Sequence, residues 1–386
     1  MTDHDSGRLA TLLREEAAAI DVPAPDAAAV RHRARGMRRR RRGLEAVAGL
    51  VVVAAVTTGV TAGVRGAGPG GGGVDAAAMA AYREQGAFAV GRVLHIGEHQ
   101  VRFESAVTSI YYTGAGVLVR RGPVADGETG GPTRYTLVRP DGSARDLGGL
   151  RMADRVPGTD IDSPYVAYAE PHEGASSPRP GLNTAWDLVA VDVTTGAEVA
   201  RHEITGAFTW GGWQAPPVTT DGTRIRALLD QGWVELDWST GAVRTVPGTA
   251  GVTLEAAHGV YADEADPAWV VRDFATGKVL RSVRPREPML GGLLSPDARY
   301  GRILDDYLSS DGVPPATPVR IVTLSNGATV TLPGSRFYGW TPDGSVLAFD
   351  PEAGTVAVCD PVTGSCDGAR RVPAGTVRLG GLSYES

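Results

Sequence analysis

Two histidines and a group of carboxylates are spaced closely enough in this chain to suggest a metal site. His95 and His99 lie four residues apart, and Asp263, Glu264 and Asp266 lie within four residues. A spacing of four brings side chains together on a helix, but the two histidines lie in a region with the pattern of a β-hairpin. The carboxylates lack the alternating ligands and the glycine of a known calcium loop. We therefore interpret them as surface histidines and an acidic turn, and we predict no metal and no cofactor.

A nucleophilic serine of the α/β-hydrolase type would require a Gly-x-Ser-x-Gly turn between a strand and a helix. The chain has no such motif and no pattern of a parallel sheet. No catalytic residue is predicted from the motifs of this class.

Two tryptophans are candidates for a ligand surface. Trp210 and Trp213 are separated by two glycines and followed by a Pro-Pro pair, a composition that does not fit a strand. Aromatic side chains in such a segment can line a binding surface, and packing in a core or loop is the alternative. The other tryptophans lie in or beside expected strands and are interpreted as packing between blades: Trp186, Trp233, Trp238, Trp269 and Trp340.

The two cysteines of the chain, Cys359 and Cys366, are predicted to form a disulfide. They flank a turn in which Asp360 can pair with Ser365, so the cysteines face each other on adjacent strands. Directly opposed positions of that kind lie about 4.5 Å apart at Cα, which is within reach of a disulfide. Such a bond forms and persists in an oxidising compartment.

A repeated turn motif shows how the elements that carry these residues are organised. Asp-x-x-Thr-Gly occurs with its glycine at positions 196, 241, 277 and 364, and related Asp-Gly and Asn-Gly turns have theirs at 142 and 327. Asp and Thr side chains bond the local backbone, while glycine adopts the positive φ that reverses the chain. Successive glycines are 54, 45, 36, 50 and 37 residues apart, with a mean of about 44, which matches the period of a propeller blade.

One repeat can be followed strand by strand. Residues 336–340, 346–349 and 355–359 are expected strands, and a fourth begins near Cys366. Four short antiparallel strands make one blade. Six repeats fit between about 104 and 376, and a hairpin at 90–103 joined by a strand at 376–384 would complete a seventh. We predict an all-β propeller of about seven four-stranded blades over residues 88–386, with six blades as the alternative.

An apolar stretch at residues 44–64 is predicted to be a single transmembrane helix. Its 21 residues would span roughly 30 Å, about one hydrocarbon core. Eight arginines between Arg31 and Arg42 place the N-terminus in the cytoplasm and the body outside. A cleaved signal peptide is the alternative, but the apolar run is longer than a signal core and about forty residues precede it.

The segments on either side of this span have different compositions. Residues 1–43 form a predicted cytoplasmic tail in which Leu9, Leu12 and Leu13 lie on one face of a helix, suited to the anionic inner leaflet or to a cytosolic partner. Residues 65–87 are predicted to be a Gly-rich linker and a short helical stalk. The net charge is −6 and the arginines are concentrated before the span, so nucleic-acid binding is not predicted.

The Asp-x-x-Thr-Gly hairpins and Pro-Asp-Gly turns resemble those of WD-repeat-like bacterial β-propellers. The layout of tail, arginines, single anchor and propeller resembles that of single-pass membrane proteins common in actinobacteria. The resemblance implies an extracytoplasmic binding or protein-interaction module at the cell membrane, which could relay to a cytosolic partner through the tail. A propeller-fold hydrolase acting on glycans or small esters at the cell surface is the alternative, and no catalytic residue is implied.

Overall fold

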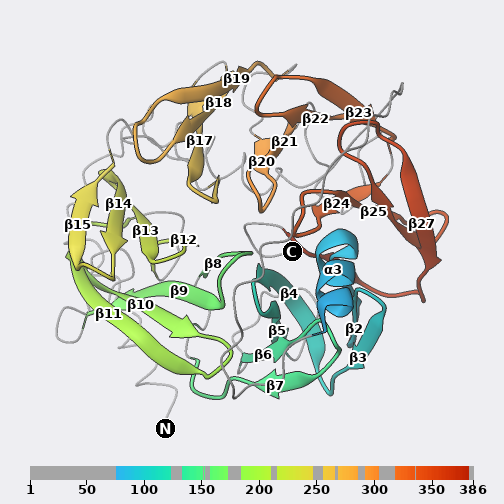
Figure 1. Ribbon diagram of the computed structural model, residues 1–386, viewed down its shortest axis with the longest axis horizontal. Coiled ribbons are helices and arrows are strands. Elements are labelled where there is room, and N and C mark those ends of the chain that lie inside the picture. Colours follow the sequence, from blue (N-terminus) through green and yellow to red (C-terminus); the bar gives the residue numbers. More distant parts are fainter. Residues whose placement is uncertain are drawn as a thin grey trace, which may run out of the picture. The chain divides into compact units, whose positions relative to one another are not determined.

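Short runs rich in Val, Leu, Tyr and Trp alternate with glycine turns, and in the computed structural model these runs form strands. The structure describes residues 75–122, 133–150, 152, 157–172, 184–209, 215–246, 255–265, 268–285, 292–303, 318–334 and 336–381. Within these residues the strands make seven four-stranded antiparallel sheets, which are arranged as blades around a common centre (Figure 1). The prediction of an all-β propeller is confirmed, and the number of blades is seven.

Blades are numbered here by their order along the chain, and within each the strands follow one another from the centre to the rim (Figure 1). Blade 1 contains β28 (Val377–Leu379), β1 (Ala87–Val90), β2 (Val93–Ile96) and β3 (His99–Arg102), and blade 2 contains β4 (Ala106–Thr113), β5 (Gly116–Gly122), β6 (Arg134–Val138) and β7 (Ala144–Asp146). Blade 3 contains β8 (Gly158–Thr159), β9 (Tyr165–Pro171), β10 (Ala185–Asp192) and β11 (Ala197–Thr205). Blade 4 contains β12 (Val218–Asp221), β13 (Arg224–Leu229), β14 (Gly232–Asp237) and β15 (Ala242–Thr245).

Blades 5 to 7 have the same order of strands as blades 2 to 4. Blade 5 contains β16 (Ala256–Ala257), β17 (Val260–Ala265), β18 (Ala268–Asp273) and β19 (Val279–Val283). Blade 6 contains β20 (Gly292–Leu294), β21 (Tyr300–Ile303), β22 (Val319–Thr323) and β23 (Thr329–Leu332). Blade 7 contains β24 (Phe337–Trp340), β25 (Val346–Asp350), β26 (Thr355–Cys359) and β27 (Cys366–Arg371).

The ring is closed by pairing of the last strand with the first. β28 pairs with β1 in antiparallel register, with Phe88 opposite Leu379 and Val90 opposite Val377. Leu379 is buried in one cluster with Phe88 and with Leu347 of blade 7. This closure, predicted from the hairpin at 90–103 and the strand near 376, completes the seventh sheet, and the radial arrangement leaves only short sheet edges.

The repeated turns join the third and fourth strands of their blades. In blade 3 the Asp192 carboxylate accepts a hydrogen bond from the backbone N–H of Thr194 at 2.7 Å, and Gly196 N–H donates to the Asp192 carbonyl at 2.7 Å. The six glycines that were aligned by the repeat all have φ between +68° and +81°. Glycine adopts that conformation without the steric cost that other residues incur, so the predicted hairpins are confirmed.

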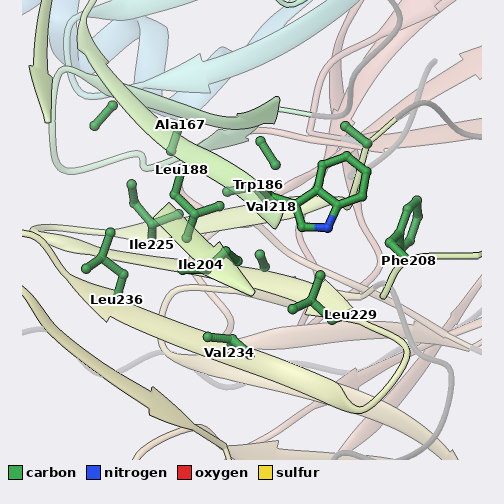
Figure 2. Close-up of a cluster of buried hydrophobic side chains, with 14 residues drawn as sticks. Ala167, Trp186, Leu188, Ile204, Phe208, Val218, Ile225, Leu229, Val234 and Leu236 are labelled. Carbon is green, nitrogen blue, oxygen red and sulfur yellow. The ribbon is translucent and has the colours of Figure 1, made fainter. Parts of the chain in front are cut away.

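The core lies between neighbouring blades and within each sheet. Trp186 packs with Leu188, Ile225 and Leu236 in a cluster shared by blades 3 and 4 (Figure 2). Its indole N–H donates to the Gly206 carbonyl at 2.9 Å, so the buried polar group has a partner. The predicted packing role is confirmed for four fully buried tryptophans and for one that is partly buried: Trp186, Trp233, Trp269, Trp340 and Trp238.

The predicted disulfide is present in blade 7. Cys359 of β26 lies directly opposite Cys366 of β27, and the two sulfurs are bonded, with 3.9 Å between the Cα atoms. Asp360 N–H donates to the Ser365 carbonyl at 2.8 Å, as the predicted turn requires. No free cysteine remains in the chain.

Helix α3 (Ala76–Gln85) corresponds to the short helix predicted in the stalk. Asp75 caps it by accepting a hydrogen bond from Ala77 N–H at 2.9 Å, and Gly86, with φ +64°, ends it. Tyr82 is buried, and its hydroxyl lies 3.0 Å from the carbonyl oxygens of Thr113 and Gly116 in blade 2. The helix is therefore packed on the propeller, and β1 begins directly after it.

Among the described residues, no helix combines the length and the apolar composition needed to cross a membrane. The predicted span at 44–64, the tail at 1–43 and the Gly-rich residues 65–74 lie outside the described residues.

Candidate functional site

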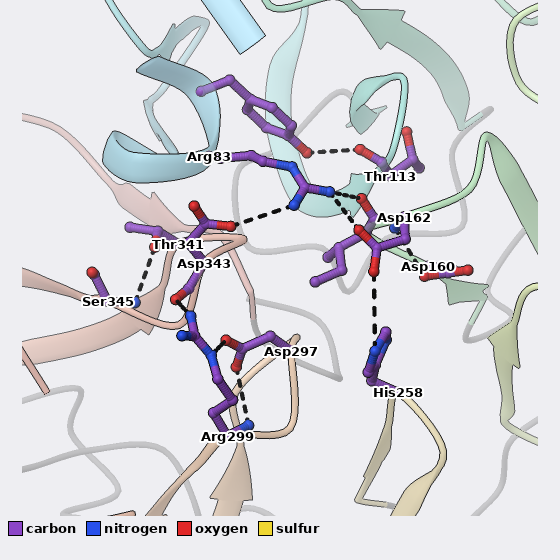
Figure 3. Close-up of polar contacts among 12 residues, drawn as sticks. Arg83, Thr113, Asp160, Asp162, His258, Asp297, Arg299, Thr341, Asp343 and Ser345 are labelled. Atoms are coloured by element: carbon purple, nitrogen blue, oxygen red, sulfur yellow. Dashed lines mark hydrogen bonds and ion pairs between the residues drawn. The ribbon is translucent and has the colours of Figure 1, made fainter. Parts of the chain in front are cut away.

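The turns that join the first and second strands of the blades gather at one end of the ring. We call this end, together with α3, the first-turn face. In blades 2 to 7 the turns are residues 114–115, 160–164, 222–223, 258–259, 295–299 and 341–345. Neighbouring turns contact one another: Gly222 N–H donates to the Asp160 carboxylate at 2.9 Å, and Arg299 donates to the Asp343 carbonyl. These contacts place charged side chains from separate blades on one surface (Figure 3).

Arg83 of α3 connects two distant blades across this face. Its Nη2 lies 2.5 Å from Asp162 Oδ1 and 3.0 Å from the Ile161 carbonyl in blade 3. The Nη1 of the same guanidinium lies 3.6 Å from Asp343 Oδ1 in blade 7 (Figure 3). One side chain of α3 therefore interacts electrostatically with blades 3 and 7.

Asp160, Asp162 and His258 meet on the inner side of this face. Their donor atoms all lie within 4.8 Å of one another, and within the described residues this is the group close enough to share a metal ion. Asp160 is buried, whereas Asp162 and His258 are exposed. His258 belongs to blade 5 and Asp162 to blade 3, with blade 4 between them in the ring. His258 Nε2 nevertheless lies 4.0 Å from Asp162 Oδ2 (Figure 3).

A second charged group lies between blades 6 and 7. The Asp297 carboxylate accepts hydrogen bonds from the Ser295 hydroxyl at 2.6 Å and from Arg299 N–H at 3.1 Å. The Arg299 guanidinium also pairs with Asp297. A Cβ on Gly344, whose φ is +77°, would lie 2.7 Å from Asp297 Oδ1, so another residue there would strain the backbone and displace the Asp297 carboxylate.

A small cavity at the centre of the ring reaches the first-turn face. It is lined by the first strands of blades 2 to 6, and Asp160 and His258 lie at its edge. Its volume of about 80 Å³ is enough for a few water molecules. Sites for small organic ligands usually measure about 300–1,000 Å³. A sugar or ester larger than a few atoms would therefore have to bind on the face, outside the cavity.

Two buried tyrosines, Tyr82 and Tyr112, support the face. Burial raises the pKa of Tyr82 well above its ordinary value, and the neighbouring Tyr112 raises it further. Burial likewise raises the pKa of Tyr112, whose hydroxyl accepts a hydrogen bond from Ala87 N–H at 2.9 Å and donates to the Trp340 carbonyl at 2.8 Å. Both phenols stay neutral near pH 7 and hold α3 and the chain closure in place.

The structure describes both histidines and two of the three carboxylates that were singled out in the sequence. His95 of β2 stacks on Phe88 with ring centroids 4.4 Å apart, and burial lowers its pKa, whereas His99 of β3 is exposed. Asp263 and Glu264 lie in strand β17, so the interpretation of this segment as a loop was wrong in part, and Asp263 lies 3.6 Å from Arg272.

Three predicted positions lie outside the described residues. They are Asp266 and the two tryptophans proposed for a ligand surface, Trp210 and Trp213.

The residues that do converge were not recognised from the sequence. The first turns of blades 3 and 5 contain Asp160, Asp162 and His258. In the repeat, these turns correspond to the Asp-Gly turns that end at Gly222 in blade 4 and at Gly344 in blade 7. Repeat phasing could have placed them on the same face. It could not have given their separation, because that depends on the number of blades and the width of the channel.

Comparisons with known proteins assign the chain to no family. No protein-family model matches the chain, and no curated protein matches it. Among solved structures, the chain is similar to TolB from Acinetobacter baumannii, with 12% identity over 76% of this chain and 64% of that chain, and a TM-score of 0.37. The chain therefore spans less than two thirds of the TolB chain.

Two further solved structures are similar to a comparable extent. One is the β-propeller domain of Cps50 (Swd1) from Myceliophteria thermophila, with 12% identity over 72% of this chain and 90% of that chain, and a TM-score of 0.41. The other is a chain of the mitotic checkpoint complex, with 10% identity over 83% of this chain and 91% of that chain, and a TM-score of 0.41. The seven-bladed assignment rests on the sheet topology described above.

Proposed function

We propose that this chain is a membrane-anchored β-propeller that works outside the cytoplasm as a binding or protein-interaction module. Its binding surface is the first-turn face of the ring. Residues 44–64 anchor it in the lipid membrane as a single pass, and residues 1–43 lie in the cytoplasm, where they contact the inner leaflet or a cytosolic partner to which binding is relayed.

The observation that carries this proposal is the combination of an exposed charged face with a cavity too small for an organic substrate. Arg83, Asp162, His258, Arg299 and Asp343 come from α3 and from four blades, and their side chains are between 33% and 58% exposed. Exposed charges of both signs, held by contacts between blades, suit a polar partner surface and fix its orientation more than they add affinity.

Membrane anchoring and export are supported by features of the sequence. The apolar run, the preceding arginines and the presence of one basic residue, Arg65, in residues 65–82 favour a cytoplasmic N-terminus. The Cys359–Cys366 disulfide suits an oxidising compartment, which is consistent with a propeller outside the cytoplasm. The layout resembles that of actinobacterial single-pass proteins.

The alternative function is hydrolysis of glycans or small esters at the cell surface. It is favoured by the convergence of Asp160, Asp162 and His258 at the edge of the cavity. Two features make it the weaker candidate: Asp162 is already ion-paired with Arg83, and the cavity is small. Hydrolysis of aryl glycosides or aryl esters that is lost in Asp162→Asn would establish this alternative in place of the binding function.

Site-specific photo-cross-linking in living cells tests the binding surface. Thr223 and Gln231 are both exposed and lie at opposite ends of β13 in blade 4. A photoreactive phenylalanine analogue at Thr223 would report on the first-turn face, and the same analogue at Gln231 would report on the other face. We expect a discrete cross-linked product from position 223 and none from position 231. Cross-linking from 231 alone, or equally from both, would contradict the proposed surface.

A further inference from the structure

We propose that Asp160, Asp162 and His258 bind one divalent transition-metal ion of the Zn²⁺ class at the edge of the central cavity. One imidazole nitrogen and two carboxylate oxygens from blades 3 and 5 supply the ligands. This site goes beyond the proposed binding function, and neither depends on the other.

The imidazole and the nearer carboxylate lie slightly farther apart than two ligands of one ion, with no direct hydrogen bond between them. His258 Nε2 and Asp162 Oδ2 are 4.0 Å apart, which is too long for a hydrogen bond. Zn²⁺ bonds of about 2.0–2.2 Å at tetrahedral angles would hold these two atoms about 3.3–3.6 Å apart, so an inward shift of the exposed His258 imidazole by about 0.5 Å would let one ion bind both. The contrast is His172, whose Nδ1 lies 2.8 Å from Asp187 Oδ1 in a direct hydrogen bond.

Asp160 is held in place for this role. Its carboxylate oxygens accept backbone hydrogen bonds from Asp162 N–H and Gly222 N–H, both at 2.9 Å, and the side chain is buried. Each oxygen of an ionised carboxylate has two lone pairs, so each keeps one for an ion. Hydrogen bonds of this kind orient the carboxylate ligands of known metal sites.

Arg83 fixes the orientation of the second carboxylate. It binds Asp162 through Oδ1, which leaves Oδ2 on the side that faces His258. The two carboxylates carry two negative charges against the one positive charge of Arg83. The site is therefore negatively charged around the position that the ion would take, and this charge balance attracts a divalent cation.

The mixed donor set selects the class of metal. Ca²⁺ and Mg²⁺ prefer sites made of oxygen ligands alone, whereas one imidazole with two carboxylates suits Zn²⁺ and its neighbours in the first transition series. Three protein ligands leave at least one coordination position for water or a ligand atom. That position would face the cavity or the solvent, because Asp160 and His258 line the cavity and Asp162 is exposed.

Co²⁺ titration of the purified full-length chain tests the site, with visible absorbance as the readout and Zn²⁺ as the competitor. His258→Asn removes the imidazole and keeps the fold, because His258 has φ +43° and asparagine tolerates this conformation better than most residues. Asp162→Asn removes a carboxylate charge at an exposed position. The matched control is His172→Gln, which removes the other histidine that is paired with a carboxylate.

We expect the wild type and His172→Gln to bind one equivalent of Co²⁺ equally, and His258→Asn and Asp162→Asn to bind it at least about tenfold more weakly. Zn²⁺ should displace Co²⁺ from the wild type. Circular dichroism and thermal melting confirm that each variant is folded. The proposal is overturned if the wild type binds no Co²⁺, or if His258→Asn and Asp162→Asn bind it as tightly as the wild type, since a site formed by other histidines would survive both changes.

Discussion

Arg83 Nη2 lies 2.5 Å from Asp162 Oδ1, so the helix that precedes the first strand is ion-paired with a turn of blade 3. The same guanidinium lies 3.6 Å from Asp343 in blade 7. Only residues 65–75 separate α3 from the predicted membrane span. In our account the helix therefore connects the anchor to the first-turn face.

Replacement of this arginine should loosen α3 without unfolding the ring. In Arg83→Met the aliphatic stem is retained and the charge is lost. Because both partners are partly exposed, the free energy of unfolding should fall by less than about 1 kcal/mol. Amide hydrogen exchange in α3 should become faster, whereas exchange in blade 4 should not change. The exposed Arg92→Met is the control, and equal exchange in α3 for the two variants would contradict this role of Arg83.

Ring closure should depend on the buried side chain of Leu379. Leu379→Ala removes contacts with Phe88 and Leu347 in a cluster shared by blades 1 and 7, and should lower the free energy of unfolding by about 2–5 kcal/mol. The control Val362→Ala changes an exposed side chain and should have almost no effect. Urea denaturation of both variants measures the difference. A loss below 1 kcal/mol in Leu379→Ala would show that β28 contributes little to closure.

The buried pair of Arg226 and Glu235 should make stability depend on acid pH. Arg226 Nε donates to Glu235 Oε2 at 2.6 Å, and Arg244 Nε donates to Oε1 at 2.8 Å. Burial alone would raise the pKa of Glu235, but the hydrogen bond from Arg244 and the charge of Arg226 together hold that pKa below its ordinary value. Because this pKa is lower in the folded state, the ionised carboxylate stabilises that state at pH values above about 4.3, the pKa of glutamate in an unfolded chain. The stabilisation is lost as the pH falls through the lower pKa of the folded state.

Glu235→Gln tests this pair directly. It removes the closer of the two carboxylates paired with the buried Arg226, the other being Asp221 at 3.4 Å, and should reduce the free energy of unfolding by about 3 kcal/mol at pH 7. The difference from the wild type should shrink when denaturation is measured below about pH 4, where the wild-type carboxyl begins to be protonated. Glu352→Gln, at an exposed turn, is the control and should match the wild type. A pH-independent difference would contradict the assignment.

The disulfide should stabilise the blade next to the point of closure. Cys359 and Cys366 are seven residues apart, and closing so short a loop is worth about 2–3 kcal/mol in the chain-entropy model. Reduction, or replacement of both cysteines by alanine, should lower the free energy of unfolding by that amount. Mass spectrometry of unreduced peptides from cells should show the two cysteines linked. Free thiols in the native protein would contradict both the bond and the case for export.

The sequence allowed prediction of features that depend on local chemistry. The hairpin at Asp192–Gly196 depends on side chains and a glycine that lie within five consecutive residues. The spacing of Cys359 and Cys366, seven residues apart, fits two opposed strand positions. The distance from Asp162 to His258 has no such local cause, because it depends on how many blades close the ring. The packing of α3 was also missed, since a helix rich in alanine gives little amphipathic signal and its main anchor is the single buried Tyr82.

Topology reporters test the central claim, a propeller held outside the cytoplasm by an uncleaved anchor. A fluorescent protein that folds in the cytoplasm should be active when fused before Asp5, and alkaline phosphatase, which needs an oxidising compartment, should be active when fused after Gly73. The full-length chain should remain in the membrane fraction with its N-terminus intact. Phosphatase that is inactive after Gly73, or a soluble body with a new N-terminus near Gly63, would contradict the account.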